Sequence, residues 1–103
     1  MRFIKPMNLN EKSFIMDVRL PEEREIVELG LPHVNQDLET LNPPEFIKQN
    51  HIEKNDTINI LCSSGGRASQ AAEMFEKAGF SNVAVIIGGL VEAEYEGLPI
   101  IRH

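Results

Sequence analysis

The sequence has no tryptophan, one tyrosine and one cysteine in 103 residues, and it contains no long apolar run. One cysteine excludes an internal disulfide and supplies only one of the roughly four ligands of a structural zinc site. No segment approaches the ~20 apolar residues that cross a bilayer, and the first residues lack the apolar core of a signal peptide. These absences predict a reduced, cytoplasmic protein with no bound metal and no membrane partner.

Positive charge is also scarce, because 10 Lys and Arg stand against 16 Asp and Glu, for a net charge of −6. Such a surface repels nucleic acid and anionic membranes, and it has no cluster of Lys or Arg to bind phosphate backbones. We therefore expect no nucleic-acid partner. Any anion site has to use local backbone dipoles and one or two cations, since salt screens charges beyond about 8–10 Å.

The length of the chain and its 42% hydrophobic content fit one compact domain over residues 1–103. Short apolar runs alternate with helical patterns, which predicts an α/β fold with a small, mostly parallel sheet and helices on both faces. Strands are expected at 13–18, near Val34, at 57–62, at 83–87 and at 98–101. Helices are expected over 21–30, from Asn42 or Pro43, over 67–78 and over 91–96.

The expected helix at 21–30 has a well-marked start. Pro21 suits the first helical position, and Glu22, Glu23 and Glu25 complement the positive end of the helix dipole. Leu20 occupies the N-cap, where Ser, Thr or Asp would cap better by about 1 kcal/mol. From the sequence, the three glutamates are explained by helix formation alone.

The segment Cys-Ser-Ser-Gly-Gly-Arg at 62–67 carries the functional signal. It leaves the carboxyl end of the expected central strand and enters a helix, where open α/β sheets bind their ligands. Small residues allow successive backbone N–H groups to curl inward around an anion, and the helix N-terminus adds partial positive charge. Such a cradle stabilises a thiolate, which makes Cys62 the candidate nucleophile. The candidate substrate-binding residues are Ser63, Ser64, Gly65, Gly66 and Ala68.

Arg67 ends this segment. It is expected to contribute fixed positive charge, or to orient the loop by bonding its carbonyls. A lone cysteine is more often an inert buried residue than a nucleophile. A run of small and flexible residues between Cys62 and a helix favours the functional interpretation, because a plain crossover needs only one cap and one glycine.

The chain resembles the rhodanese-like domains in several segments that occur in the family's order. The six residues from Cys62 to Arg67 are similar to the family's catalytic loop, which opens with Cys and ends with Arg. The other similar segments are Asp-Val-Arg at 17–19, the acidic helix start at 21–23, Gly-Leu-Pro at 30–32, Gly-Phe-Ser-Asn-Val at 79–83, the double glycine at 88–89 and Gly-Leu-Pro-Ile at 97–100. The resemblance implies a three-layer α/β/α fold.

The resemblance also implies an enzyme of the thiosulfate sulfurtransferase kind. Cys62 would attack the outer sulfur of thiosulfate or of a thiol persulfide, hold that sulfur as a persulfide, and pass it to cyanide or to a thiol on a small molecule or a protein. No metal and no organic cofactor is implied. A monomer or a weak homodimer fits a domain of this size.

Asp17 and Arg19 are supporting candidates, because they follow a buried strand at the edge where the Cys62 loop also lies. The resemblance suggests that Asp17 braces the site through Arg67, and a surface ion pair worth at most about 1 kcal/mol is the alternative. The three histidines show no metal-ligand spacing, and His33 is expected in a solvent-exposed loop. Tyr95 is the one aromatic residue expected at the mouth of the site.

Two departures from the family bear on the donor. Ser63 stands where members active on thiosulfate often have Arg or Lys, and Ala68 stands where Ser or Thr usually follows the Arg. One cation fewer beside a dianion costs on the order of 1–3 kcal/mol when the contact is partly desolvated. Thiosulfate is therefore expected to be a poor donor.

Two other functions use the same features. A non-catalytic or redox-sensing rhodanese-like module would keep the fold without turnover, and Ser63 and Ala68 leave that alternative open. A Cys-dependent phosphatase or arsenate reductase would need a wider loop, one residue longer between Cys and Arg. Four residues lie between Cys62 and Arg67, which favours sulfur over a tetrahedral phosphate.

Overall fold

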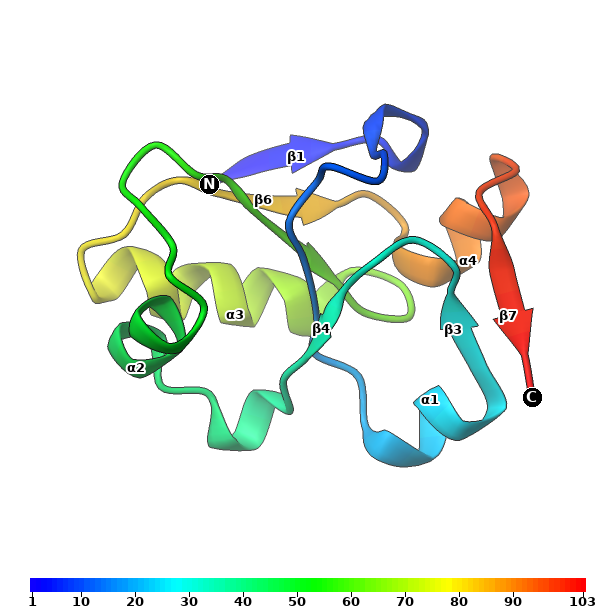
Figure 1. Ribbon diagram of the computed structural model, residues 1–103, viewed down its shortest axis with the longest axis horizontal. Helices are drawn as coiled ribbons and strands as arrows, with labels where there is room; N and C mark the ends of the chain where they lie inside the picture. The colour runs from blue at the N-terminus through cyan, green and yellow to red at the C-terminus, as the bar shows by residue number, and fades with distance from the viewer.

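The computed structural model describes residues 1–103 and contains a central sheet of five strands in the order β1-β6-β5-β2-β4 (Figure 1). All four neighbouring pairs are parallel. The strands of this sheet are β1 (Arg2–Ile4), β2 (Ile15–Asp17), β4 (Val34–Asn35), β5 (Ile58–Leu61) and β6 (Val83–Ile86). The predicted parallel sheet is confirmed, with β5 at its centre.

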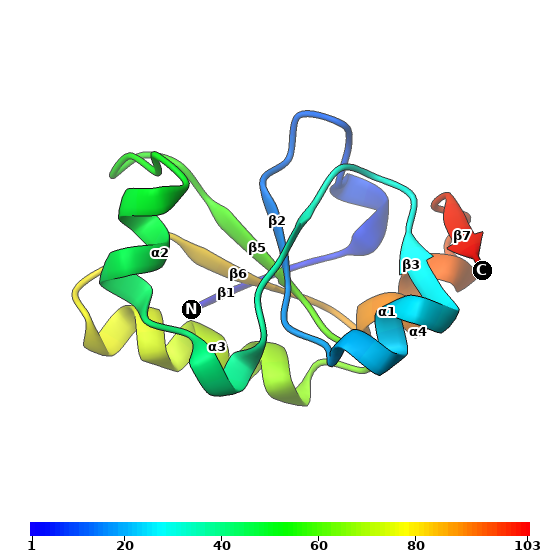
Figure 2. The same ribbon diagram turned by 60° about the horizontal axis from the view of Figure 1, so that its bottom comes forward.

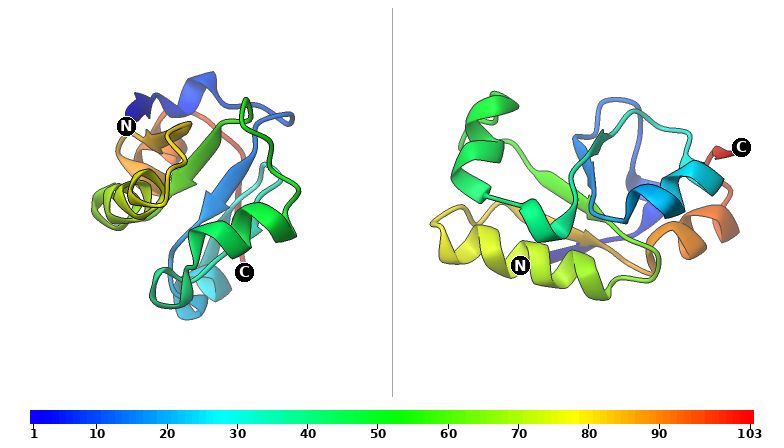
Figure 3. Two further views of the ribbon diagram at one scale, coloured as in Figure 1. Left: turned by 90° about the vertical axis from the view of Figure 1, so that its left-hand side faces the viewer. Right: turned by 90° about the horizontal axis from the view of Figure 1, so that it is seen from below.

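Helices cover both faces of the sheet, which confirms the predicted three-layer fold. They are α1 (Pro21–Ile26), α2 (Pro43–Gln49), α3 (Gly66–Lys77) and α4 (Gly89–Tyr95), with short 3-10 helices η1 (Pro6–Asn8) and η2 (Leu38–Thr40). Figure 3 shows α2 and α3 together on one face. Figure 2 shows α1 and α4 grouped with the C-terminus, at the opposite end of the molecule from α2.

Alternating side chains of the central strands divide the core into two clusters. Ile58 and Ile60 of β5 point to the cluster that includes Phe46 and Phe75 of α2 and α3, whereas Leu61 belongs to the second cluster, with Leu90 of α4 among its members. Because β5 is covered on both sides, its sequence is a nearly continuous apolar run rather than an alternating one. The helices all lack the length and the apolar composition of a membrane-spanning segment.

The expected helix at 21–30 is wrong in its second half. α1 ends at Ile26, and the chain continues as β3 (Val27–Leu29), which pairs antiparallel with β7 (Ile100–Arg102) in a separate ribbon of two strands. The side chain of Leu29 is buried in the second core cluster. Ile26 and Val27 are β-branched residues, which favour strands, and a partner more than seventy residues away completes the pairing. Strand β1 was also not expected from the sequence.

Candidate active site

The sheet brings the candidate residues together at the carboxyl ends of β2 and β5. These strands are parallel neighbours, and the Val18 N–H donates to the Leu61 carbonyl at 2.9 Å just beyond their last paired residues. The chain then leaves β2 toward α1 and leaves β5 toward α3. The expectation that Asp17 and Arg19 lie on the same side as the Cys62 loop is therefore confirmed.

Cys62 lies directly after β5 and is only 1% exposed. Its Sγ accepts a hydrogen bond from the Gly65 N–H at 2.8 Å. This turn requires glycine, because Gly65 has φ +120°, which residues with a side chain rarely adopt. The N–H groups of Gly66, Arg67 and Ala68 form the first turn of α3 and have no backbone or side-chain acceptor. The thiol thus lies at the positive end of a twelve-residue helix.

The start of α4 supports the loop from the other side. The Leu90 N–H donates to the Cys62 carbonyl at 2.8 Å, and the Val91 N–H donates to the Ser63 carbonyl at 3.3 Å. Gly89 has φ +61°, and a Cβ there would lie 2.4 Å from the Cys62 carbonyl oxygen. The second glycine of the pair at 88–89 therefore allows α4 to approach the loop backbone closely enough to bind both carbonyls.

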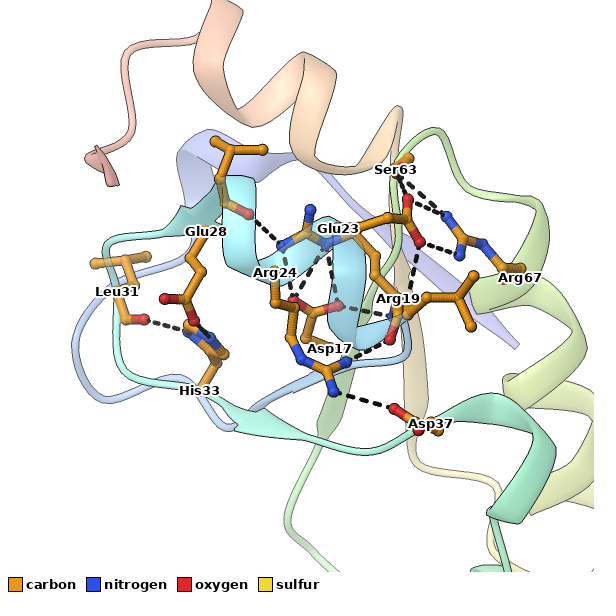
Figure 4. A network of polar contacts seen from close by, with 12 residues as sticks. Asp17, Arg19, Glu23, Arg24, Glu28, Leu31, His33, Asp37, Ser63 and Arg67 are labelled. Carbon is orange, nitrogen blue, oxygen red and sulfur yellow. Dashed lines mark hydrogen bonds and ion pairs between the residues drawn. The ribbon is translucent and has the colours of Figure 1, made fainter. Parts of the chain in front are cut away.

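Arg67 pairs with Glu23 of α1, as Figure 4 shows. Arg67 Nη1 donates to Glu23 Oε1 at 2.5 Å and Nη2 donates to Oε2 at 2.9 Å. Ser63 Oγ donates to Glu23 Oε2 at 2.8 Å and accepts from Arg67 Nη2 at 3.2 Å. The predictions that Arg67 bonds loop carbonyls, or links to Asp17, are both wrong. The guanidinium reaches across to another element instead.

Each member of this pair shifts the pKa of the other in the direction that favours the charged form. The hydrogen bond from Arg67 is the largest influence on Glu23 and, against the effect of burial, lowers its pKa from 4.5 to about 2. The pKa of Arg67 is raised in turn, first by Glu23 and to a lesser degree by the charges of Cys62 and Asp17. Both groups therefore remain charged throughout the physiological pH range.

Glu23 is the residue at this site that sequence reasoning missed. Its Oε1 also accepts a hydrogen bond from the Leu20 N–H at 2.9 Å. Leu20 is the N-cap of α1 and Glu23 is the third helical residue, so this is the bond that the N3 side chain makes in a capping box. The available signal was its position, three residues after the N-cap of a helix that starts at the same edge of the sheet as the Cys62 loop. The sequence alone did not indicate which of the early glutamates would face Arg67.

Asp17 and Arg19 form a pair of a different kind, with side chains that are 0% and 1% exposed. Arg19 Nε and Nη2 donate to the Asp17 carboxylate at 3.2–3.3 Å, and Nη2 also donates to the Val27 carbonyl at 2.8 Å. Arg24 donates to the Arg19 carbonyl, which attaches α1 to the same point (Figure 4). The alternative of a surface ion pair is therefore wrong, because the pair is buried and joins β2 to the start of β3.

Residues 3–95 match the family model described as the rhodanese-like domain. The chain belongs to the rhodanese-like family. It is 33% identical over 91 residues to thiosulfate sulfurtransferase 16, chloroplastic, of Arabidopsis thaliana, with 82% of this chain and 76% of the relative covered. It is also 33% identical over 89 residues to the putative sulfur carrier protein YrkF of Bacillus subtilis, with 85% of this chain but only 45% of that relative covered.

Solved structures agree with the fold of this rhodanese-like chain. The protein SSP1007 from Staphylococcus saprophyticus matches it with a TM-score of 0.74 and 27% identity, over 96% of this chain and 99% of that one. The protein BH2092 from Bacillus halodurans matches with a TM-score of 0.79 and 20% identity, over 98% and 77% of the two chains. The architecture is therefore shared even where few residues are.

A hollow of about 430 Å³ adjoins the rhodanese-like loop beside Ser63 and Glu23. Four apolar residues form one part of its lining. Ile26 at the end of α1 and Val27 at the start of β3 contribute two of them, and Leu90 and Val91 of α4 contribute the others. Tyr95 does not line this hollow and is 85% exposed, so its expected place at the mouth of the site is wrong. Among the other loop residues, Ser64 is exposed and the Ala68 side chain is buried in the core.

None of the hydrogen bonds to Cys62 comes from a histidine, although His103 lines the hollow. His33 is half-buried rather than exposed, because its Nδ1 contacts the Leu31 carbonyl at 2.8 Å and its Nε2 lies 3.4 Å from Glu28. His103 contacts the same carboxylate at 2.7 Å. The hydrogen bonds from His103 and His33 lower the pKa of Glu28. No group of three or more His, Cys, Asp or Glu side chains is placed to hold a metal ion.

Proposed function

We propose that this protein is a sulfurtransferase that carries a sulfane sulfur on Cys62. The observation that supports this most directly is the 2.8 Å hydrogen bond from the Gly65 N–H to Cys62 Sγ at the start of α3. A donor in this position favours an anionic sulfur over a neutral thiol, since hydrogen bonds to charged acceptors are the stronger ones. Relatives named as a thiosulfate sulfurtransferase and as a putative sulfur carrier protein support the same chemistry.

The proposed reaction has two displacement steps at sulfur. In the first, the Cys62 thiolate attacks the outer sulfur of the donor, a new S–S bond forms, and the donor's own S–S bond breaks. Sulfite or a thiolate leaves with the electron pair of that bond. In the second step, cyanide or an acceptor thiolate attacks the outer sulfur of the Cys62 persulfide, and Cys62 leaves as a thiolate. Each step moves one sulfur atom without an external oxidant or reductant, and no cofactor is proposed.

The loop residues have separate proposed roles. Beyond Gly65, the N–H groups of Gly66, Arg67 and Ala68 have no acceptor in the protein, and they would bind the terminal sulfur of the persulfide or the donor's anionic group. Ser63 and Ser64 provide hydroxyl groups at the loop's outer surface. Arg67 compensates the negative charge of Glu23 beside the loop.

The proposed location and oligomeric state follow from the use of a cysteine as the nucleophile. A cysteine nucleophile has to stay reduced, which is why we propose a cytoplasmic location and a monomer or weak homodimer that leaves the loop open. The donor would be thiosulfate or a thiol persulfide, and the acceptor a thiol on a small molecule or a protein.

Mass spectrometry of the intact protein tests the proposal. Incubation with thiosulfate or with glutathione persulfide should add the mass of one sulfur atom, and a small thiol or cyanide should then remove it. Cys62→Ala is the control that should gain nothing. Failure of both donors to load the wild-type protein would instead favour a non-catalytic or redox-sensing module. Release of phosphate from an aryl phosphate, without persulfide formation, would favour a phosphatase.

A further inference from the structure

We infer that Glu23 is a specificity-determining residue, which neutralises Arg67 and thereby biases the site toward organic thiol persulfides and away from the thiosulfate dianion. This inference rests on the proposed function, since it concerns the donor that loads Cys62. The geometry carries it: a carboxylate takes both terminal nitrogens of Arg67, at 2.5 and 2.9 Å, and the hydroxyl of Ser63 at 2.8 Å.

The two arginines that line the hollow, and Arg67 beside its lining residues Glu23 and Ser63, each have a carboxylate partner. Besides Arg67 with Glu23, Arg19 pairs with Asp17 and Arg102 pairs with Glu94. Arg19, Glu23, Glu94 and Arg102 all line the hollow. A dianion that enters this space meets two arginines and two carboxylates, and it finds no unpaired guanidinium to bind. Backbone N–H groups alone would then have to balance both of its charges.

The shape and lining of the hollow favour an organic donor. Thiosulfate is a small tetrahedral anion and would fill only a fraction of about 430 Å³. The apolar wall of Ile26, Val27, Leu90 and Val91 offers it no hydrogen bonds, whereas the carbon skeleton of a thiol persulfide gains from burial against such side chains. Ile26 and Val91 are each 68% exposed, so this wall is open to an incoming molecule.

Glu23→Gln is the variant that separates charge from structure. Glutamine keeps a side-chain oxygen that can accept the Leu20 N–H, so the cap of α1 is preserved while the charge is removed. The positive charge of Arg67 beside Ser63 is then no longer neutralised by a carboxylate. Glu22→Gln is the matched control, since it changes the net charge equally on the same helix from an exposed position that contacts neither Arg67 nor Ser63.

The measurement is kcat/KM for thiosulfate and for glutathione persulfide, expressed as the ratio of the two. We expect Glu23→Gln to raise the thiosulfate-to-persulfide ratio by about tenfold, the size of one added charge-assisted contact, and Glu22→Gln to change it less than about twofold. Glu23→Asp should retain most of the wild-type ratio, because it keeps the charge. A purely structural role would lower both values together and leave the ratio unchanged.

The outcomes are distinct from those of the proposed function. If the wild-type protein loads sulfur from persulfide but the ratio is the same in Glu23→Gln, this inference is overturned while the sulfurtransferase proposal stands. An equal rise in Glu22→Gln would also overturn it, because the effect would then reflect net charge. If neither donor loads the wild-type Cys62, the proposed function itself fails.

Discussion

Two Arg–carboxylate pairs lie at the same edge of the sheet, but one is fully buried and the other is about a third exposed. Asp17 and Arg19 are 0% and 1% exposed, whereas Glu23 and Arg67 are 30% and 32% exposed. The buried pair joins residues two apart and holds β2 to β3, and the open pair joins residues 44 apart and faces the Cys62 loop. The same ionic chemistry therefore supports the backbone in one place and sets the charge of the candidate site in the other.

Burial explains why these roles differ. Water screens a pair that is about a third exposed, so such a pair contributes little to the stability of the fold, but its charges still act on a ligand beside them. A fully buried pair has no water to replace a missing partner, and removing one partner leaves a charge unpaired in the core. Substitutions at the two pairs should therefore separate stability from donor chemistry.

The largest expected effect is on stability, at Arg19. Arg19→Ala should lower the free energy of unfolding by about 3–5 kcal/mol, because the Asp17 carboxylate would remain buried without its partner. Urea denaturation monitored by circular dichroism measures this change. A loss below about 1 kcal/mol would mean that water reaches Asp17 and that the contrast between the pairs is wrong.

The second effect is on activity, at Arg67. Arg67→Ala should lower the free energy of unfolding by at most about 1 kcal/mol. It should slow persulfide formation from both donors about tenfold, since the Glu23 carboxylate would be left uncompensated near the Cys62 thiolate. Single-turnover loading followed by mass spectrometry measures the rate. Arg2→Ala is the control and should load nearly as fast as wild type, because Arg2 bonds Thr57 and Asn82 and does not line the hollow.

The third effect is the pH dependence of the open pair. Because the pKa of Glu23 is lowered from 4.5 to about 2 on folding, its contribution to stability is fully present above pH 4.5 and is lost as the pH falls toward 2. The difference in unfolding free energy between wild type and Glu23→Gln should therefore be constant from pH 5 to pH 8 and shrink below pH 4.5. Urea titrations at several pH values test this, and a difference that grows in acid would contradict it.

The smallest effect is expected at Ser63. Ser63→Ala removes the hydroxyl that bridges Glu23 and Arg67, but the two direct bonds between those residues remain. The free energy of unfolding should change by no more than about 1 kcal/mol, and the thiosulfate-to-persulfide ratio of kcat/KM by less than about twofold. A larger change in this ratio would mean that Ser63, rather than Glu23, determines which donor the site prefers.

Local sequence patterns predicted the parts of this protein that depend on near neighbours. The apolar run at 57–62 became β5, and the small residues Ala68, Ala71 and Ala72, with Phe75, became the buried face of α3. The spacing from Cys62 to Arg67 placed the loop between them. The sequence-based expectation failed at β3, where the predicted helix is replaced by a strand paired with β7. A strand near β7 was expected at 98–101, but no local signal indicates that it pairs with residues 27–29.

The sequence by itself determined four of the five strands of the sheet, the helix after the loop and the position of one cysteine at the boundary between strand and helix. Hydrophobic periodicity and turn residues act over a few residues, which is why these features could be predicted. Only the tertiary structure decided what Arg67 contacts. Of the two carboxylates available at this edge, Asp17 is taken by Arg19 inside the core, and Glu23 projects from the first turn of α1 toward the loop. The charge at the Cys62 site depends on that choice. It arises because β2 and β5 are parallel neighbours, so that α1 and α3 begin at the same edge of the sheet and Arg67 reaches Glu23.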